Sequence, residues 1–126
     1  MKEEAEYYKL MLELAGHDFI AMSKLQTDDV PEDVFGFHCQ QAIEKTFKAL
    51  IDFYGKKFPL THELEDLYDI LLEINSDIAK FDELVFFTPY SVLIRYGEVG
   101  FDEPLNRQKA IADVKNLIDF AQATTL

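Results

Sequence analysis

Four polar residues share one face of the longest helical pattern in the sequence: His38, Gln41, Lys45 and Lys48. They are three or four positions apart, and at 3.6 residues per turn this spacing places them on one side of a helix. An imidazole, an amide and two ammonium groups in a row can donate hydrogen bonds to a phosphate. The same residues can also form a solvated face, since Glu44 and Lys48 have the spacing of an ordinary surface ion pair.

A second group with chemical potential stands just before the glycine-containing stretch Tyr96 to Glu103. It consists of Tyr90, Arg95 and Tyr96. An arginine beside aromatic rings can stack on a base or bind phosphate. It can equally neutralise the carboxyl end of its own helix, so both interpretations of Arg95 stay open.

Asp18 is the polar exception on an otherwise apolar helix face, between Met11, Leu14 and Met22. A buried carboxylate needs a hydrogen-bonded or charged partner, because burial of an unpaired charge is very costly. The basic residues Lys45, Lys48 and Arg95 are all candidates for that role. We therefore assign Asp18, with Gln41 and Glu44, to a structural polar network.

The sequence lacks the standard catalytic and cofactor motifs, including the phosphate-binding loop, GxGxxG, GxSxG, HExxH and CxxC. His17, His38 and His62 stand on separate elements, and none has a second histidine or a cysteine at ligand spacing. The single cysteine, Cys39, falls on an apolar helix arc. We predict no metal site and no cofactor.

Hydrophobic periodicity predicts five helical segments. The central one spans Pro31 to Gly55, with an apolar arc of Phe35, Cys39, Ala42, Ile43, Thr46, Phe47, Leu50, Phe53 and Tyr54. The others are expected over residues 2–26, from Thr61 to about Asn75, from Ser76 or Asp77 through a kink or restart at Thr88-Pro89 to about Ile94, and from Asp102 onward. The predicted fold is an all-α, four- to five-helix up-and-down antiparallel bundle forming one domain over residues 1–126.

Composition narrows the classes of partner. The net charge of −12 over 126 residues argues against a broad nucleic-acid surface, which requires lysine and arginine against phosphates. A local basic pocket or a basic protein partner stays compatible with it. The acidic start MKEEAEYYKL does not read as a signal peptide, and no apolar run reaches the roughly 20 residues of a membrane span. We expect a cytoplasmic protein.

Several of these residues together resemble the HEPN domain family, whose name abbreviates higher eukaryotes and prokaryotes nucleotide-binding. The resemblance covers nearly the whole chain. It is carried by Asp18, the run FHCQQAIEKTFKAL from Phe37 to Leu50, PLTHEL from Pro59 to Leu64, and Arg95-Tyr96. It implies a helical bundle that homodimerises, often beside a nucleotidyltransferase and in some cases within a toxin–antitoxin pair.

The resemblance also implies a metal-independent ribonuclease where an Arg-x(4–6)-His motif is complete. Here Gly100, Phe101 and Asp102 stand where that histidine would be, and no histidine follows His62. Arg95 therefore matches only the first half of the motif. A loop carboxylate such as Asp102 is poorly suited to acid/base work near neutrality unless burial raises its pKa.

The leading hypothesis is a non-catalytic HEPN module that homodimerises and binds a nucleotide or a nucleotidyltransferase partner. Under this hypothesis Arg95, Tyr96, Lys45, Lys48 and His38 supply the phosphate and base contacts. One alternative is a degenerate ribonuclease that uses Arg95 with His38 or His62. The other is a dimerisation scaffold, with apolar anchors at Phe37 and in the aromatic stretch from Phe86 to Tyr90.

Overall fold

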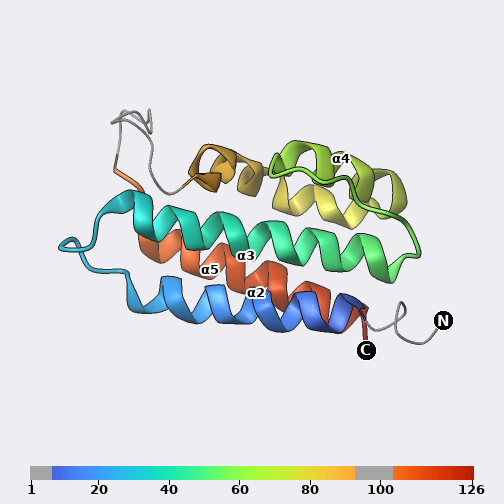
Figure 1. Ribbon diagram of the computed structural model, residues 1–126, viewed down its shortest axis with the longest axis horizontal. Helices are drawn as coiled ribbons and strands as arrows, with labels where there is room; N and C mark the ends of the chain where they lie inside the picture. Colours follow the sequence, from blue (N-terminus) through green and yellow to red (C-terminus); the bar gives the residue numbers. More distant parts are fainter. Residues whose placement is uncertain (1–6, 93–103) are drawn as a thin grey trace.

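The computed structural model describes residues 7–92 and 104–126, and every element within those ranges is a helix (Figure 1). In chain order the elements are α2 (Tyr7–Lys24), α3 (Glu32–Phe53), α4 (Leu64–Ile74), η1 (Ser76–Ser91) and α5 (Arg107–Thr124). The all-α class predicted from hydrophobic periodicity is confirmed. No helix in the described part of the chain is long and apolar enough to cross a membrane.

Helix α3 is the centre of the bundle and contacts all four other elements. Glu32 and Asp33 in its first turn complement the positive end of the helix dipole. Gly55, at φ 80°, takes the left-handed conformation that follows many helix ends. The predicted apolar arc is buried except at its carboxyl end, where Phe53 is 36% exposed and Tyr54 is partly buried.

The α2–α3 hairpin is closed by a residue from the far end of the chain. The guanidinium of Arg107, at the start of α5, donates to the backbone carbonyls of Leu25, Thr27 and Val30 at 2.9, 2.7 and 2.7 Å. It also lies 5.3 Å from the centre of the Phe35 ring. Because several donors in a fixed fork satisfy several acceptors, this arginine holds the α2–α3 connection against α5.

The connection between α3 and α4 turns back along α3 before α4 begins (Figure 1). The side chain of Gln40 donates to the carbonyl of His62 at 3.0 Å, although 22 positions separate them. The predicted helix start at Thr61 is wrong by about one turn, since α4 begins at Leu64. Thr61 instead accepts from the backbone of Glu63, and the Leu64 N–H donates to Thr88 of η1.

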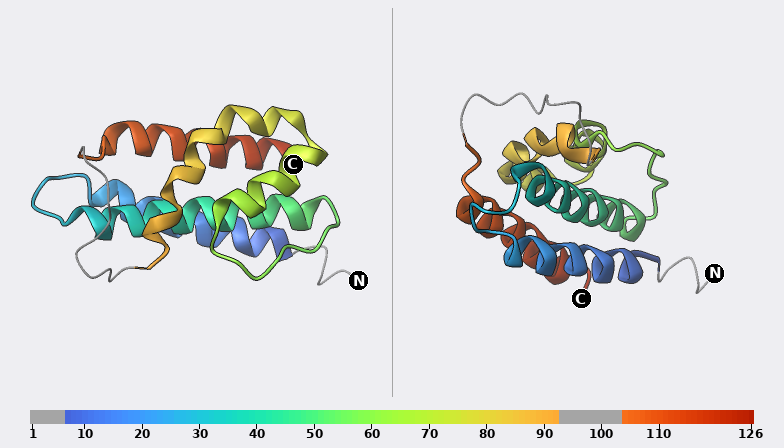
Figure 2. Two further views of the ribbon diagram at one scale, coloured as in Figure 1. Left: turned by 90° about the horizontal axis from the view of Figure 1, so that it is seen from above. Right: turned by 60° about the vertical axis from the view of Figure 1, so that its left-hand side comes forward.

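The segment η1 has 3-10 geometry and crosses above α3 (Figure 2). Its non-helical residue is Phe81, so the kink that we placed at Thr88-Pro89 lies earlier in the chain. The residue that caps it is Asn75, not Ser76 or Asp77, because the Asn75 side chain accepts from the Asp77 N–H. Helical geometry ends at Ser91, and residues 93 and 94 lie outside the described residues.

The last helix also begins later than predicted. Asn106, not Asp102, precedes its first residue and accepts a hydrogen bond from the Lys109 N–H. Just before it, the Leu105 N–H donates to the carboxylate of Glu32. The start of α5 is therefore fixed to the first turn of α3, and its apolar stripe is buried at Val114, Leu117 and Ala121.

Candidate functional site

Helix α3 reaches solvent through one narrow stripe of side chains. Between Phe35 and Ile51 every residue is buried except four, each of which is partly exposed. We call these four the α3 stripe: Phe37, His38, Gln41 and Lys45. They bring an aromatic ring, an imidazole, an amide and an ammonium group together on one face of the helix.

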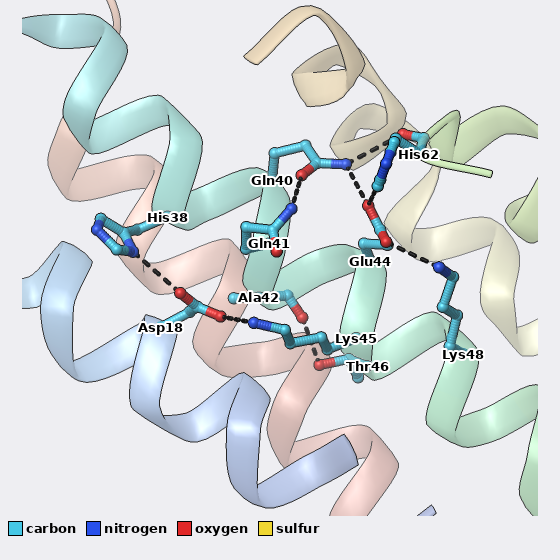
Figure 3. Close-up of polar contacts among 10 residues, drawn as sticks. All are labelled: Asp18, His38, Gln40, Gln41, Ala42, Glu44, Lys45, Thr46, Lys48 and His62. Carbon is cyan, nitrogen blue, oxygen red and sulfur yellow. Dashed lines mark hydrogen bonds and ion pairs between the residues drawn. The ribbon is translucent and has the colours of Figure 1, made fainter. Parts of the chain in front are cut away.

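Two members of the α3 stripe share one carboxylate from the neighbouring helix (Figure 3). Asp18 of α2 is 9% exposed, and its Oδ2 accepts from Lys45 Nζ at 2.6 Å while its Oδ1 lies 2.9 Å from His38 Nδ1. The predicted burial of Asp18 is confirmed. Of the basic candidates for its partner, Lys45 pairs with Asp18 and Lys48 pairs with Glu44, while Arg95 lies outside the described residues; His38 is a further partner.

This arrangement leaves donors on the outer side of the cluster. Because a carboxylate only accepts, His38 donates through Nδ1 and its Nε2 stays available. That nitrogen makes no hydrogen bond with the described residues, nor do the two remaining N–H groups of Lys45. The His38 and Lys45 side chains are 29% and 26% exposed, so a ligand in solvent can reach both.

A second polar cluster lies where α3 faces the returning connection (Figure 3). The carboxylate of Glu44 accepts from Lys48 Nζ at 2.8 Å and from Gln40 Nε2 at 2.9 Å, and His62 Nδ1 lies 3.1 Å away. Burial alone raises a carboxyl pKa, but the hydrogen bonds from Lys48, Gln40 and His62 outweigh it. The pKa of Glu44 is therefore held below its ordinary value.

Three members of the second cluster are buried where the sequence pattern placed polar surface, whereas the side chain of the fourth, His62, is 70% exposed. Gln40 is fully buried, and Glu44 and Lys48 are 5% and 8% exposed. The expected Glu44–Lys48 pair does form, but it is a buried pair, with the ammonium also 5.4 Å from the Phe58 ring. Gln41 joins the α3 stripe to this cluster by donating to Gln40 at 2.8 Å.

The remaining candidate residues are Tyr90, which is buried, and three residues that lie outside the described ranges. Tyr90 is 1% exposed and its hydroxyl lies 3.5 Å from Glu32. Burial and the nearby Glu32 raise the pKa of that hydroxyl. Arg95, Tyr96 and Asp102 lie outside the described residues.

Neither a metal cluster nor a reactive thiol is found within residues 7–92 and 104–126. No group of three or more histidine, cysteine, aspartate or glutamate side chains in those ranges is arranged to hold a metal ion. Cys39 is fully buried in the core, and burial raises the pKa of its thiol far above the ordinary value. Such a thiol is a poor nucleophile.

Comparison with protein families gives one match, to the HEPN domain, over residues 8–124. Comparison with curated proteins and with solved structures gives no match. The matched range begins in the first turn of α2 and ends with the last residue of α5. The match covers nearly the whole all-α bundle, and this chain therefore belongs to the HEPN domain family.

Proposed function

We propose that this HEPN domain binds a nucleotide through the α3 stripe and does not cleave RNA. The burial pattern of α3 carries the proposal. From Phe35 to Ile51 the helix exposes only the four side chains of the stripe. Those side chains have the chemistry that a nucleotide requires, because nucleotides combine an aromatic base with a polyanionic tail.

Each member of the stripe has a role in this proposal. The ring of Phe37 offers a face on which a base can stack. The two remaining N–H groups of Lys45 donate to phosphate oxygens, and Nε2 of His38 donates to them when the ring carries a second proton. Gln41 already donates to Gln40, so its carbonyl oxygen is left to accept from an exocyclic amine of the base.

Asp18 positions the side chains of His38 and Lys45 for binding. It fixes both in place, so little conformational freedom remains to be lost when a phosphate arrives. Lys48 has no part in the site, because its ammonium is held by Glu44 inside the second cluster. Arg95 keeps the phosphate role implied by the family resemblance.

Calorimetric titration with ATP, GTP and AMP tests this function. Lys45→Gln removes one ammonium group from the stripe, and we expect nucleotide affinity to fall about ten-fold, since a hydrogen bond to a charged group contributes about 1.5 kcal/mol or more. Lys115→Gln is the matched control, because it removes the same charge from an exposed position on α5. The proposal is wrong if wild type binds none of the three nucleotides, or if Lys45→Gln and Lys115→Gln lose the same nucleotide affinity.

We also propose that the chain forms a homodimer and acts with a nucleotidyltransferase partner in a toxin–antitoxin-like pair, as the family resemblance implies. Phe37, partly exposed on α3, is the anchor of the dimer in this account, and the nucleotide site then lies at the edge of the dimer interface, where a base stacks on the part of the ring that the second copy leaves exposed. Light scattering after size exclusion tests it: Phe37→Asp should yield a monomer, and Phe86→Asp, at a 49% exposed ring on η1, should not. A Phe37→Asp protein that stays dimeric excludes this anchor.

The competing function is a ribonuclease that uses Arg95 with a histidine from another helix. His38 and His62 are both candidates for it, because the Nδ1 of each lies beside a carboxylate, Asp18 at 2.9 Å and Glu44 at 3.1 Å, and leaves Nε2 available. Incubation of RNA with wild type and with Arg95→Ala, in the absence of metal, distinguishes the two functions. We expect neither protein to cleave, whereas cleavage by wild type alone would establish the enzyme.

A further inference from the structure

A groove runs between η1 and α5, away from the residues assigned so far. Two clefts, of about 620 and 410 Å³, adjoin there and share Glu83, Leu84, Lys109 and Asp113 in their walls. We call the pair the η1–α5 groove. Its combined size lies in the range of pockets that take a ligand or several side chains of a partner.

The floor of the larger cleft is aromatic and apolar. Phe81 and Leu84 of η1 are 7% and 3% exposed, and the ring of Phe120 of α5 lies 5.3 Å from that of Phe81. The kink of η1 is centred on Phe81, and η1 crosses above α3 (Figure 2). Residues of both η1 and α5 line the groove, so it lies between these two elements.

The aromatic floor already holds a cation. Nζ of Lys80 lies 4.9 Å from the centre of the Phe120 ring and 5.5 Å from that of Phe81. An ammonium within about 6 Å of a ring centre is attracted by the negative face of the ring.

The rim of the groove is acidic. Four carboxylates line the larger cleft, against the two ammonium groups of Lys80 and Lys109. Lys109 is engaged by Asp113 at 2.7 Å and Glu83 at 3.3 Å, and these two contacts raise its pKa. Asp82 has no ion-pair partner among the described residues, so the rim keeps unneutralised negative charge.

We propose that the η1–α5 groove is a docking surface for a basic amphipathic helix of a partner protein. Leucine-like side chains of that helix would pack on Phe81, Leu84 and Phe120, and its lysines or arginines would pair with the acidic rim. This is the usual mode in which a helix fits a groove, with anchors at i, i+3, i+4 and i+7. A second copy of this chain matches the acidic rim less well than a basic helix does, because each copy carries −12; the homodimer proposed above is anchored at Phe37 on α3 and not in this groove.

The docking surface is independent of the nucleotide site, since the groove and the α3 stripe have no residue in common. A peptide of about five helical turns, with leucines at helical spacing and lysines on the flanks, serves as the probe. Two comparison peptides separate shape from charge: one with the same composition in scrambled order, and one with glutamate in place of lysine. The readout is the amide resonance of each residue in the full-length protein during titration.

We expect the amphipathic basic peptide to shift resonances of residues 80–84 and 109–120, and both comparison peptides to leave them unchanged. Asp82→Lys should weaken binding about five-fold, because it replaces an attractive charge by a repulsive one at the rim. Glu13→Lys, the same charge change at an exposed position on α2, should weaken it less than about two-fold. Both residues are exposed, so both variants should fold as wild type does.

Four results would overturn the proposal. The first is the absence of shifts at peptide concentrations on the order of 1 mM, and the second is a set of shifts that maps to other elements. The third is equal binding of the scrambled peptide, or equal weakening by Asp82→Lys and Glu13→Lys, which would indicate general attraction to an acidic protein. The fourth is a shift of the groove resonances with protein concentration alone, which would indicate self-association.

Discussion

Removal of the Lys48 ammonium should destabilise the bundle far more than removal of an exposed ammonium with the same local geometry. Lys48 and Lys115 each pair with a carboxylate four positions away in the chain, at 2.8 Å. The Lys48 and Glu44 side chains are 11% and 7% exposed, whereas those of Lys115 and Asp119 are 61% and 53% exposed. The two pairs therefore differ mainly in burial.

Lys48→Met leaves the Glu44 carboxylate in the protein interior without its cation. Loss of one partner of a buried ion pair costs about 3 to 5 kcal/mol. Glu44 keeps its contacts with Gln40 and His62, so we expect the lower end of that range, about 3 kcal/mol. For a chain of this length that corresponds to a fall in melting temperature of roughly 10 °C. Lys115→Met should cost less than about 0.5 kcal/mol.

Urea unfolding followed by circular dichroism measures both free energies. The double variant Glu44→Gln/Lys48→Met removes both charges, so it should be more stable than Lys48→Met alone. A cost below about 1 kcal/mol for Lys48→Met, or equal costs for Lys48→Met and Lys115→Met, would refute the argument. Either result would mean that the Glu44 cluster behaves as ordinary surface.

Three further outcomes follow from the contacts around α3. Folding lowers the pKa of Glu44, so the stability that its carboxylate contributes is present above the ordinary pKa of 4.5 and is lost as pH falls through the folded pKa. In urea titrations, wild type should therefore lose more stability than Glu44→Gln between about pH 5 and pH 3. Gly36→Ala should cost about 2 kcal/mol, because its methyl group would overlap the Tyr90 ring, whereas Gly16→Ala meets no atom and should be neutral or stabilising, as thermal melts would show. Arg107→Lys should lower stability by about 2 kcal/mol in the same melts, because an ammonium cannot reproduce the fork that satisfies three carbonyls; an unchanged melting temperature would exclude that role.

The sequence predicts the helices and the buried position of Asp18 because both depend on local periodicity. An acid that falls inside an apolar face must be buried and paired, and this holds whatever the neighbouring helix is. The choice of partner depends on how α2 is placed against α3, which helical spacing alone does not determine. For that reason the sequence leaves three candidate partners of Asp18 open: Lys45, Lys48 and Arg95.

For Gln40 and Glu44, local periodicity predicts the wrong environment. On the helix they stand at the margin of a polar strip, and helical spacing alone predicts solvent around them. They are buried because the connection after α3 returns along the helix and places His62 beside Gln40. That return is a tertiary contact, which helical spacing does not predict. Its one sign in the local sequence is the charged pair of Glu44 and Lys48, whose side chains need partners when they are buried. The later start of α4 has the same origin, because Thr88 of η1 satisfies its first free N–H.

The response of the His38 ring nitrogens to ATP tests the proposed nucleotide site most directly. Long-range nitrogen–proton spectra separate the three histidines and report Nδ1 and Nε2 individually. We expect the Nε2 resonance of His38 to move on titration while Nδ1 keeps the signature of a donor to Asp18, and we expect Lys45→Gln to suppress that movement. A His38 ring that does not respond to ATP, while wild type binds ATP, would place the nucleotide away from the α3 stripe and contradict the account.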